Sequence, residues 1–113
     1  MLTVFGALAD LERAGGRAAL CTVIAARGSV PRHAGSKMLA YPDGRLVGTV
    51  GGGQMESRVI AAALEALQTG AAQTVTYRLI NPAAGDPGVC GGEIEVFIEP
   101  VRLRGANQDV DPA

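Results

Sequence analysis

Three glycine-rich stretches carry most of the residues in this sequence that could bind or react with a ligand. They are GSVPRHAGS at 28–36, GTVGGGQ at 48–54 and GDPGVCGG at 85–92. Glycine loses more backbone entropy on folding than alanine does, so it needs a reason such as a sharp bend or a ligand that approaches the backbone. We therefore expect these stretches to be loops that meet at one end of the fold.

The first stretch carries potential cations and hydroxyl groups. Arg32 and Lys37 lie in or beside it, and Ser29 adds a hydroxyl donor. Arginine can bind a phosphate group through two parallel hydrogen bonds, so this composition is typical of an anion site. The alternative is a solvated basic turn, since charged surface loops are common. His33 has no partner histidine in the sequence and carries little weight as a ligand or base.

The second stretch predicts a strand, then the glycines Gly51, Gly52 and Gly53, and then a helix. Free N–H groups at the start of such a helix, together with its dipole, suit a phosphate or carboxylate. The glycine spacing matches neither the dinucleotide fingerprint nor a P-loop. Glu56 falls in the first helical turn, where it either stabilises the helix or contacts a ligand. Because a carboxylate repels anions, a contact to a polar ring is the better functional reading.

The third stretch contains Cys90, the most reactive-looking side chain in the sequence. It lies between glycines, and its thiolate could be stabilised by N–H groups or by Arg32 or Lys37. A thiolate suits soft metals and sulfur chemistry. Cys21 lies in an apolar run and is expected to be a small buried hydrophobic residue. Two cysteines and one histidine cannot complete a four-ligand zinc site.

Composition excludes several classes of function. A chain of 113 residues has room for one domain, and its net charge of −1 and pI of about 5.7 give no overall attraction to nucleic acid or anionic lipid. The apolar runs are too short or too interrupted to span a bilayer, and the first residues lack a signal-peptide pattern. We expect a cytoplasmic protein with free thiols.

Hydrophobic periodicity predicts an α+β fold, with a single mixed or antiparallel sheet and two main helices packed on it. The strand at 18–26 is continuously apolar, so it should be central and covered on both faces. The segments KMLAY and RLVGTV should form a hairpin around Pro42–Gly44. The other expected elements are helices at 2–14 and 53–68, strands at 73–80 and 93–99, and a flexible tail at 104–113 after a domain at 1–103.

Taken together, GSVPRHAGSKM, DGRLVGTVGGGQMES and VCGGEIEVFIEPV resemble the amino-terminal domain of the xanthine dehydrogenase accessory protein family (XdhC/CoxI type). The resemblance covers residues 5 to 102. It implies a maturation chaperone that binds molybdenum cofactor transiently, assists its sulfuration and helps insert it into a xanthine dehydrogenase or CO dehydrogenase-type molybdenum hydroxylase. It also implies a cysteine desulfurase and the apo-enzyme as partners, together with self-association into a homo-oligomer.

The resemblance suggests roles for particular residues, with no catalytic residue among them. Phosphate or pterin would be held by the first two loops, and the molybdenum or sulfur end would lie at Cys90, which is also the candidate metal ligand. Glu56 matches an acidic position of the family's glycine motif and would hydrogen-bond the pterin. The full set of expected cofactor-binding residues is Ser29, Arg32, Lys37, Gly51, Gly52, Gly53, Glu56, Cys90, Gly91 and Gly92.

Two departures from the family pattern keep other functions open. Many members have cysteine where this chain has Gln54, and many continue into a carboxyl-terminal Rossmann-like domain. The alternative function is therefore a docking or oligomerisation module for a molybdoenzyme or a separate Rossmann-like partner, without cofactor binding of its own. A third possibility is an enzyme in which Cys90 carries sulfur or acts as a redox thiol.

Overall fold

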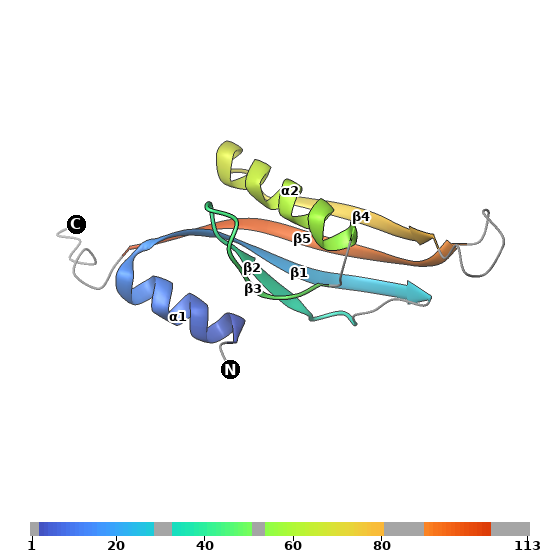
Figure 1. Ribbon diagram of the computed structural model, residues 1–113, viewed down its shortest axis with the longest axis horizontal. Coiled ribbons are helices and arrows are strands. Elements are labelled where there is room, and N and C mark those ends of the chain that lie inside the picture. Colours follow the sequence, from blue (N-terminus) through green and yellow to red (C-terminus); the bar gives the residue numbers. More distant parts are fainter. Residues whose placement is uncertain (1–2, 29–32, 51–53, 81–89, 105–113) are drawn as a thin grey trace.

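The computed structural model describes residues 3–28, 33–50, 54–80 and 90–104. Within these ranges the side chains of Gln54, Leu79, Ile80, Cys90 and Gly91 are not described. The elements follow one another as α1 (Val4–Ala14), β1 (Gly16–Gly28), β2 (Lys37–Ala40), β3 (Leu46–Gly48), α2 (Gln54–Thr69), β4 (Gln73–Ile80) and β5 (Cys90–Leu103). This order confirms the expected α+β class (Figure 1).

The described strands form one antiparallel sheet in the order β3-β2-β1-β5-β4. The strand predicted at 18–26 is β1, and it occupies the central position. It is flanked by β2 on one side, with Cys21 opposite Met38, and by β5 on the other, with Cys21 opposite Ile98. β1 is longer than predicted because its polar and glycine ends are also paired with β5.

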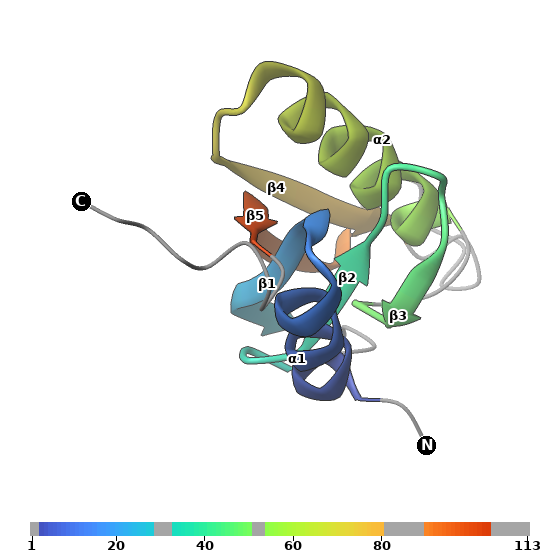
Figure 2. The same ribbon diagram turned by 90° about the vertical axis from the view of Figure 1, so that its left-hand side faces the viewer.

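The two helices cover opposite faces of the sheet (Figure 2). Met38 and Leu39 are neighbours on β2, so their side chains point to opposite faces. Both are fully buried, but Met38 packs in the cluster beneath α2 and Leu39 in the cluster beneath α1. The central strand is therefore covered on both faces, as its continuous apolar sequence predicts.

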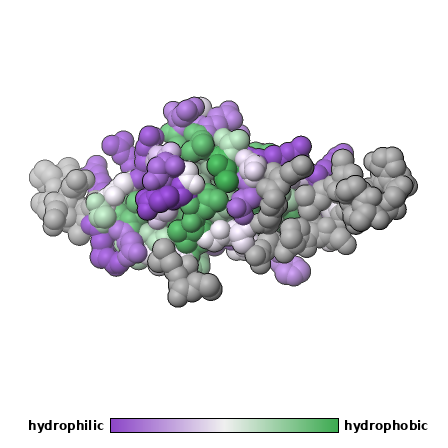
Figure 3. All heavy atoms as spheres, viewed as in Figure 1, coloured by the Kyte–Doolittle hydropathy of each residue, from purple (hydrophilic) through white to green (hydrophobic). Residues whose placement is uncertain are grey.

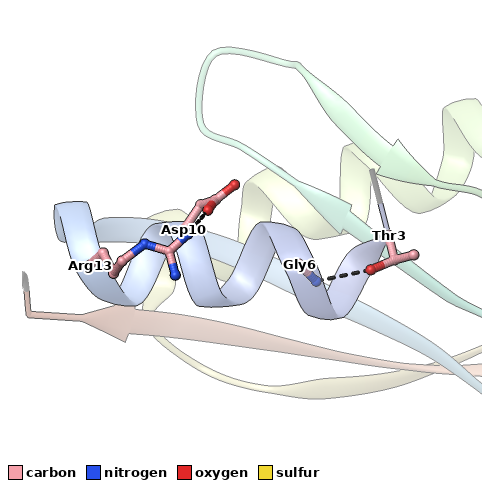
Figure 4. A network of polar contacts seen from close by, with 4 residues as sticks. All are labelled: Thr3, Gly6, Asp10 and Arg13. Atoms are coloured by element: carbon pink, nitrogen blue, oxygen red, sulfur yellow. Dashed lines mark hydrogen bonds and ion pairs between the residues drawn. The ribbon is translucent and has the colours of Figure 1, made fainter. Parts of the chain in front are cut away.

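Local signals fix both ends of α1 (Figure 4). The hydroxyl of Thr3 accepts a hydrogen bond from the backbone N–H of Gly6 at 3.0 Å, which satisfies one of the free donors of the first turn. Asp10 and Arg13 form an ion pair one turn apart. Gly15, with a φ of 80°, follows the last turn, and its N–H bonds to the carbonyl of Leu11.

The apolar face predicted for α2 packs on the sheet, and the helix ends before Gly70 as its sequence predicts. The N–H of Gly70 closes the last turn on the carbonyl of Ala66. None of the described helices is long and apolar enough to cross a membrane. The buried side chains of α2 are those of Met55, Val59, Ala63, Ala66 and Leu67.

β5 is longer than the strand predicted at 93–99. Cys90, Gly91 and Gly92 lie within it rather than in a loop, because β1 and β4 both extend far enough to pair with this segment. At its other end β5 continues through Pro100, which pairs with Ala19. The pairing of β5 with β4 ends at Ile98, so β4 has no residue beside Pro100. The missing N–H of Pro100 therefore leaves no carbonyl group of β4 without a hydrogen-bond donor.

Gly48 is the position in the hairpin where the fold demands glycine. Its φ is +81°, and a Cβ atom there would lie 2.6 Å from the carbonyl oxygen of Lys37. At Gly44, with a φ of +93°, a Cβ atom would meet nothing within 4 Å. We expect Gly48→Ala to lower the free energy of unfolding by about 1–3 kcal/mol more than the matched control Gly44→Ala. Urea denaturation followed by circular dichroism measures both, and equal losses would contradict the predicted clash.

Candidate functional site

The three glycine-rich connections follow strands that run in the same direction (Figure 1). β1 ends at Gly28 and β4 at Ile80, near the start of β5 at Cys90, whereas β3 ends at Gly48, level with Cys21 in the middle of β1. The shared direction follows from the antiparallel order, because β1, β3 and β4 run one way while β2 and β5 run the other way. We call the end toward which β1, β3 and β4 run the glycine-loop end.

The three connections leave the sheet at two different levels along the strand direction. Lys37 begins β2 opposite Thr22, and Thr22 is opposite Phe97 on β5. Cys90 lies seven residues before Phe97 on that strand, which at 3.3 Å per residue is roughly 20 Å. The predicted site residues therefore form two groups, one near Lys37 and one near Cys90.

The first group connects β2 to the start of α2. The carbonyl of Lys37 abuts Gly48, and the next residue, Thr49, donates a hydrogen bond from its hydroxyl to Oε2 of Glu56 at 2.7 Å. Nζ of Lys37 lies 3.5 Å from the hydroxyl oxygen of Thr22, at the limit of hydrogen bonding. Gly48 and Thr49 thus bring the backbone of Lys37 and the carboxylate of Glu56 to one corner of the fold, but the Lys37 side chain lies beside Thr22, on the face of the sheet opposite α2.

Glu56 has a structural role as well as a candidate binding role. Its carboxylate lies in the first turn of α2, where negative charge is favourable. One oxygen is bonded to Thr49, while Oε1 makes no hydrogen bond with the part of the chain that the structure describes. The hydrogen bond fixes the orientation of the carboxylate, and Oε1 can accept an N–H from a ligand.

The described part of the first loop is fastened to β1. The N–H of Val23 donates to the carbonyl of Ser36, and the N–H of Gly35 donates to the carbonyl of Val23. The register of β1 with β5 shifts between Val23 and Ala25, which makes Ile24 an extra residue. The described residues 33–36 of this loop therefore lie against the middle of β1, beside Val23.

The second group corrects the prediction that Cys90 sits in an open loop. Cys90 is the first residue of β5 and pairs with Ile80, and Gly92 is buried between Gly28 and Leu79. The reactivity of Cys90 and its metal-binding role stay predictions, because its side chain is not described.

An ion-pair cluster next to Gly92 was not predicted. Glu93 bonds Arg27 of β1 at 2.9 Å and Arg78 of β4 at 3.4 Å, and all three are register partners. Exposed pairs of this kind contribute little stability. The two guanidinium groups outnumber the carboxylate of Glu93, but Glu95 lies two residues farther along β5 on the same face and offsets the extra charge. This grouping is visible only from the strand register. The Thr49–Glu56 pair could have been looked for in the sequence, because Thr49 is a polar residue shortly before a glutamate in the first turn of the predicted helix.

The described residues contain no cluster of three or more histidine, cysteine, aspartate or glutamate side chains that could hold a metal ion. Cys21 is fully buried, as predicted, and burial raises the pKa of its thiol to about 12. It is therefore an unreactive core residue. Ser29, Arg32, Gly51, Gly52 and Gly53 lie outside the described residues, and so do the glycines of the third loop before Cys90.

Two cavities formed by described residues lie away from these loops. One, of about 1010 Å³, is lined by Arg17, Arg102 and Arg104 with Gly16 and Leu103. The other, of about 510 Å³, lies between the end of α1 and the turn of the β2–β3 hairpin. Both lie where β1 begins, at the opposite end of that strand.

Comparison with known proteins defines the class to which this fold and site belong. The model of the XdhC and CoxI family matches residues 11–78, which include β1, the hairpin, α2 and most of β4. The chain belongs to the XdhC and CoxI family. This confirms the resemblance seen in the three glycine-rich stretches.

Two proteins of Escherichia coli (strain K12) are similar to the chain. The uncharacterized protein YqeB is 38% identical over 98 residues, which are 86% of this chain and 18% of YqeB. The molybdenum cofactor insertion chaperone PaoD is 32% identical over 85 residues, 75% of this chain and 27% of PaoD. The chain therefore spans about a fifth to a quarter of the length of these relatives.

A solved structure from Bacillus halodurans shares the fold. It is a crystal structure at 2.80 Å resolution of a protein described as a xanthine dehydrogenase, and it superposes with a TM-score of 0.67 at 31% sequence identity. The match covers 84% of this chain and 28% of that one. The architecture described above is thus also found within a longer polypeptide.

The raised pKa of Cys21 predicts a pH dependence of stability. Because folding favours the neutral thiol, its contribution is complete below the unfolded pKa of about 9 and is lost as pH rises toward about 12. We expect the unfolding free energy of the wild type to fall faster than that of Cys21→Ala over this range, by up to about 1.4 kcal/mol per pH unit. Parallel profiles from urea titrations between pH 8 and pH 11 would contradict the prediction.

The Thr49–Glu56 hydrogen bond predicts energetic coupling between the two residues. In a double-mutant cycle of Thr49→Val and Glu56→Ala, we expect a coupling free energy of about 1 kcal/mol, since the bond has a charged acceptor but is partly exposed. Chemical denaturation of the four proteins measures it. Pairing Thr49→Val with Glu65→Ala, an exposed glutamate farther along α2, provides the control and should give additive losses.

Proposed function

We propose that this chain binds molybdenum cofactor at the glycine-loop end and assists its sulfuration and insertion into a molybdenum hydroxylase. Membership of the XdhC and CoxI family and similarity to PaoD, a molybdenum cofactor insertion chaperone, support this function. The observation that carries it is topological. Three glycine-rich connections follow strands that run in one direction in an antiparallel sheet, and in our proposal they supply the groups that hold the phosphate, the pterin ring and the molybdenum with its sulfur ligand.

The described residues fit such a cargo in chemical type. Nζ of Lys37 supplies positive charge for a phosphate on the face of the sheet that carries Thr22. On the opposite face, the first turn of α2 adds the positive end of a helix dipole, and Oε1 of Glu56 offers an acceptor for the N–H groups of a pterin. Arg27 and Arg78 add guanidinium groups where β1 and β4 end.

The roughly 20 Å offset between Lys37 and Cys90 constrains how the cargo lies. In our proposal the cofactor extends between these two levels. Arg32, Ser29 and the backbone of Gly51–Gly53 would hold the phosphate and pterin. Cys90, with Gly91 and Gly92 behind it, would face the molybdenum and its sulfur ligand.

The proposed partners follow from this role. They are the molybdenum hydroxylase apo-enzyme, which receives the cofactor, and a cysteine desulfurase, which supplies sulfur. A second copy of the chain and a Rossmann-like domain, in the same protein or a separate one, complete the proposed set. The chain acts as an accessory factor and not as a turnover enzyme.

Retention of isolated molybdenum cofactor tests the proposal. Under anaerobic conditions we expect near-stoichiometric binding by the wild type and about tenfold weaker binding by Arg32→Ala, Lys37→Ala or Cys90→Ala, because each loses a charged or thiolate contact. Fluorescence of the oxidised pterin after gel filtration measures it. The control Arg13→Ala removes an exposed cation that is paired with Asp10 on α1, and should bind like the wild type.

No retention by a folded wild type would contradict cofactor binding and favour the docking module. The surface gives that alternative some support. Phe5 and Ile24 are 68% and 48% exposed, and hydrophobic residues form a band across the middle of the face shown in Figure 3. In that case the chain should form a complex with the hydroxylase that Arg32→Ala and Cys90→Ala leave unchanged.

A further inference from the structure

Three arginines converge where β1 begins and β5 ends, the end that faces the viewer in Figure 2. Arg17 and Arg102 are register partners on adjacent strands, and Arg104 follows two residues later. Together with Gly16 and Leu103 they line a cavity of about 1010 Å³, which we call the arginine cleft. The cleft is far from the glycine loops, since the twelve steps of β1 from Gly16 to Gly28 measure about 40 Å.

The placement of these charges is unfavourable by itself. Side chains directly opposite on antiparallel strands lie about 5 Å apart at Cβ, and like charges there repel. Arg17 donates one hydrogen bond, 3.1 Å long, to the carbonyl of Leu67 in the last turn of α2. That bond uses one of five N–H donors and does not neutralise the guanidinium.

Most of the other described arginines differ in their partners. Arg13, Arg27, Arg45 and Arg78 each form an ion pair with a carboxylate, whereas Arg58 stands by itself on the exposed side of α2 without one in the described ranges. Among the described residues, no carboxylate pairs with Arg17, Arg102 or Arg104. The cleft therefore concentrates three positive charges without a counter-charge from the described part of the protein.

We propose that the arginine cleft is a binding site for an oxyanion, a phosphate or a carboxylate. Guanidinium groups bind such groups through paired hydrogen bonds, and a bound oxyanion removes the repulsion between Arg17 and Arg102. The oxyanion comes either from a separate phosphate-bearing molecule or from the carboxylates of Asp109 and Asp111, which follow Arg104 in the sequence. This site is independent of the proposed cofactor site.

Titration of the full chain with inorganic pyrophosphate tests the site. By isothermal titration calorimetry at constant ionic strength, we expect saturable binding that weakens about tenfold or more in the double variant Arg102→Gln, Arg104→Gln. Arg17 is left in place because its bond to Leu67 supports α2. The control is Arg13→Gln, which removes the same charge from the exposed surface of α1 and should leave the affinity unchanged.

A variant with Asp109→Asn and Asp111→Asn distinguishes the two sources. If it binds pyrophosphate as the wild type does, the oxyanion is a separate molecule. If it binds at least tenfold more tightly, the aspartates occupy the cleft in the wild type. Either result supports the proposal. Absence of saturable binding in both proteins would overturn it, as would equal weakening by Arg13→Gln or unchanged affinity in the double arginine variant.

Discussion

β1 and β5 pair along nearly their whole lengths, and every other element is attached to this two-stranded ribbon. β2 and β4 extend it on either side, and α2 packs across it through residues such as Cys21 and Ile98. The ribbon is buried at its centre, where Val23 and Val96 face each other with no exposed surface. Changing the register by one residue would move these side chains to the opposite face, so the core fixes the positions of both strand ends.

That register also sets charged side chains at the two ends of the ribbon. At one end it places Arg27, Glu93 and Arg78 side by side. At the other end it places Arg17 beside Arg102. The same ladder thus separates the two groups of arginines by about the length of a strand.

Most of the fold could be predicted from local sequence signals, but the site only in part. The helix ends follow from Thr3, Gly15 and Gly70, and the hairpin follows from Pro42 to Gly44, because these residues act on their immediate neighbours. The extension of β5 to Cys90 depends instead on partners far away in the sequence. The glycines beside Cys90, considered alone, indicate a loop. The segment is a strand because β1 pairs with one of its edges and β4 with the other. The ion pairs of Glu93 were hidden for the same reason, since their partners come close only through the strand register. The bond between Thr49 and Glu56 is local in the sequence.

The order β3-β2-β1-β5-β4 also has a consequence for how the chain folds as it is synthesised. The first strand is completed by the last, so the ribbon cannot form until the segment up to Leu103 has left the ribosome. Until then the β2–β3 hairpin and α2 can form from local contacts. The edge of β1 that pairs with β5 stays without its partner strand. Long-range pairing of this kind is slow and exposes strand edges to association. The emerging chain is therefore most in need of protection just before its final strand appears.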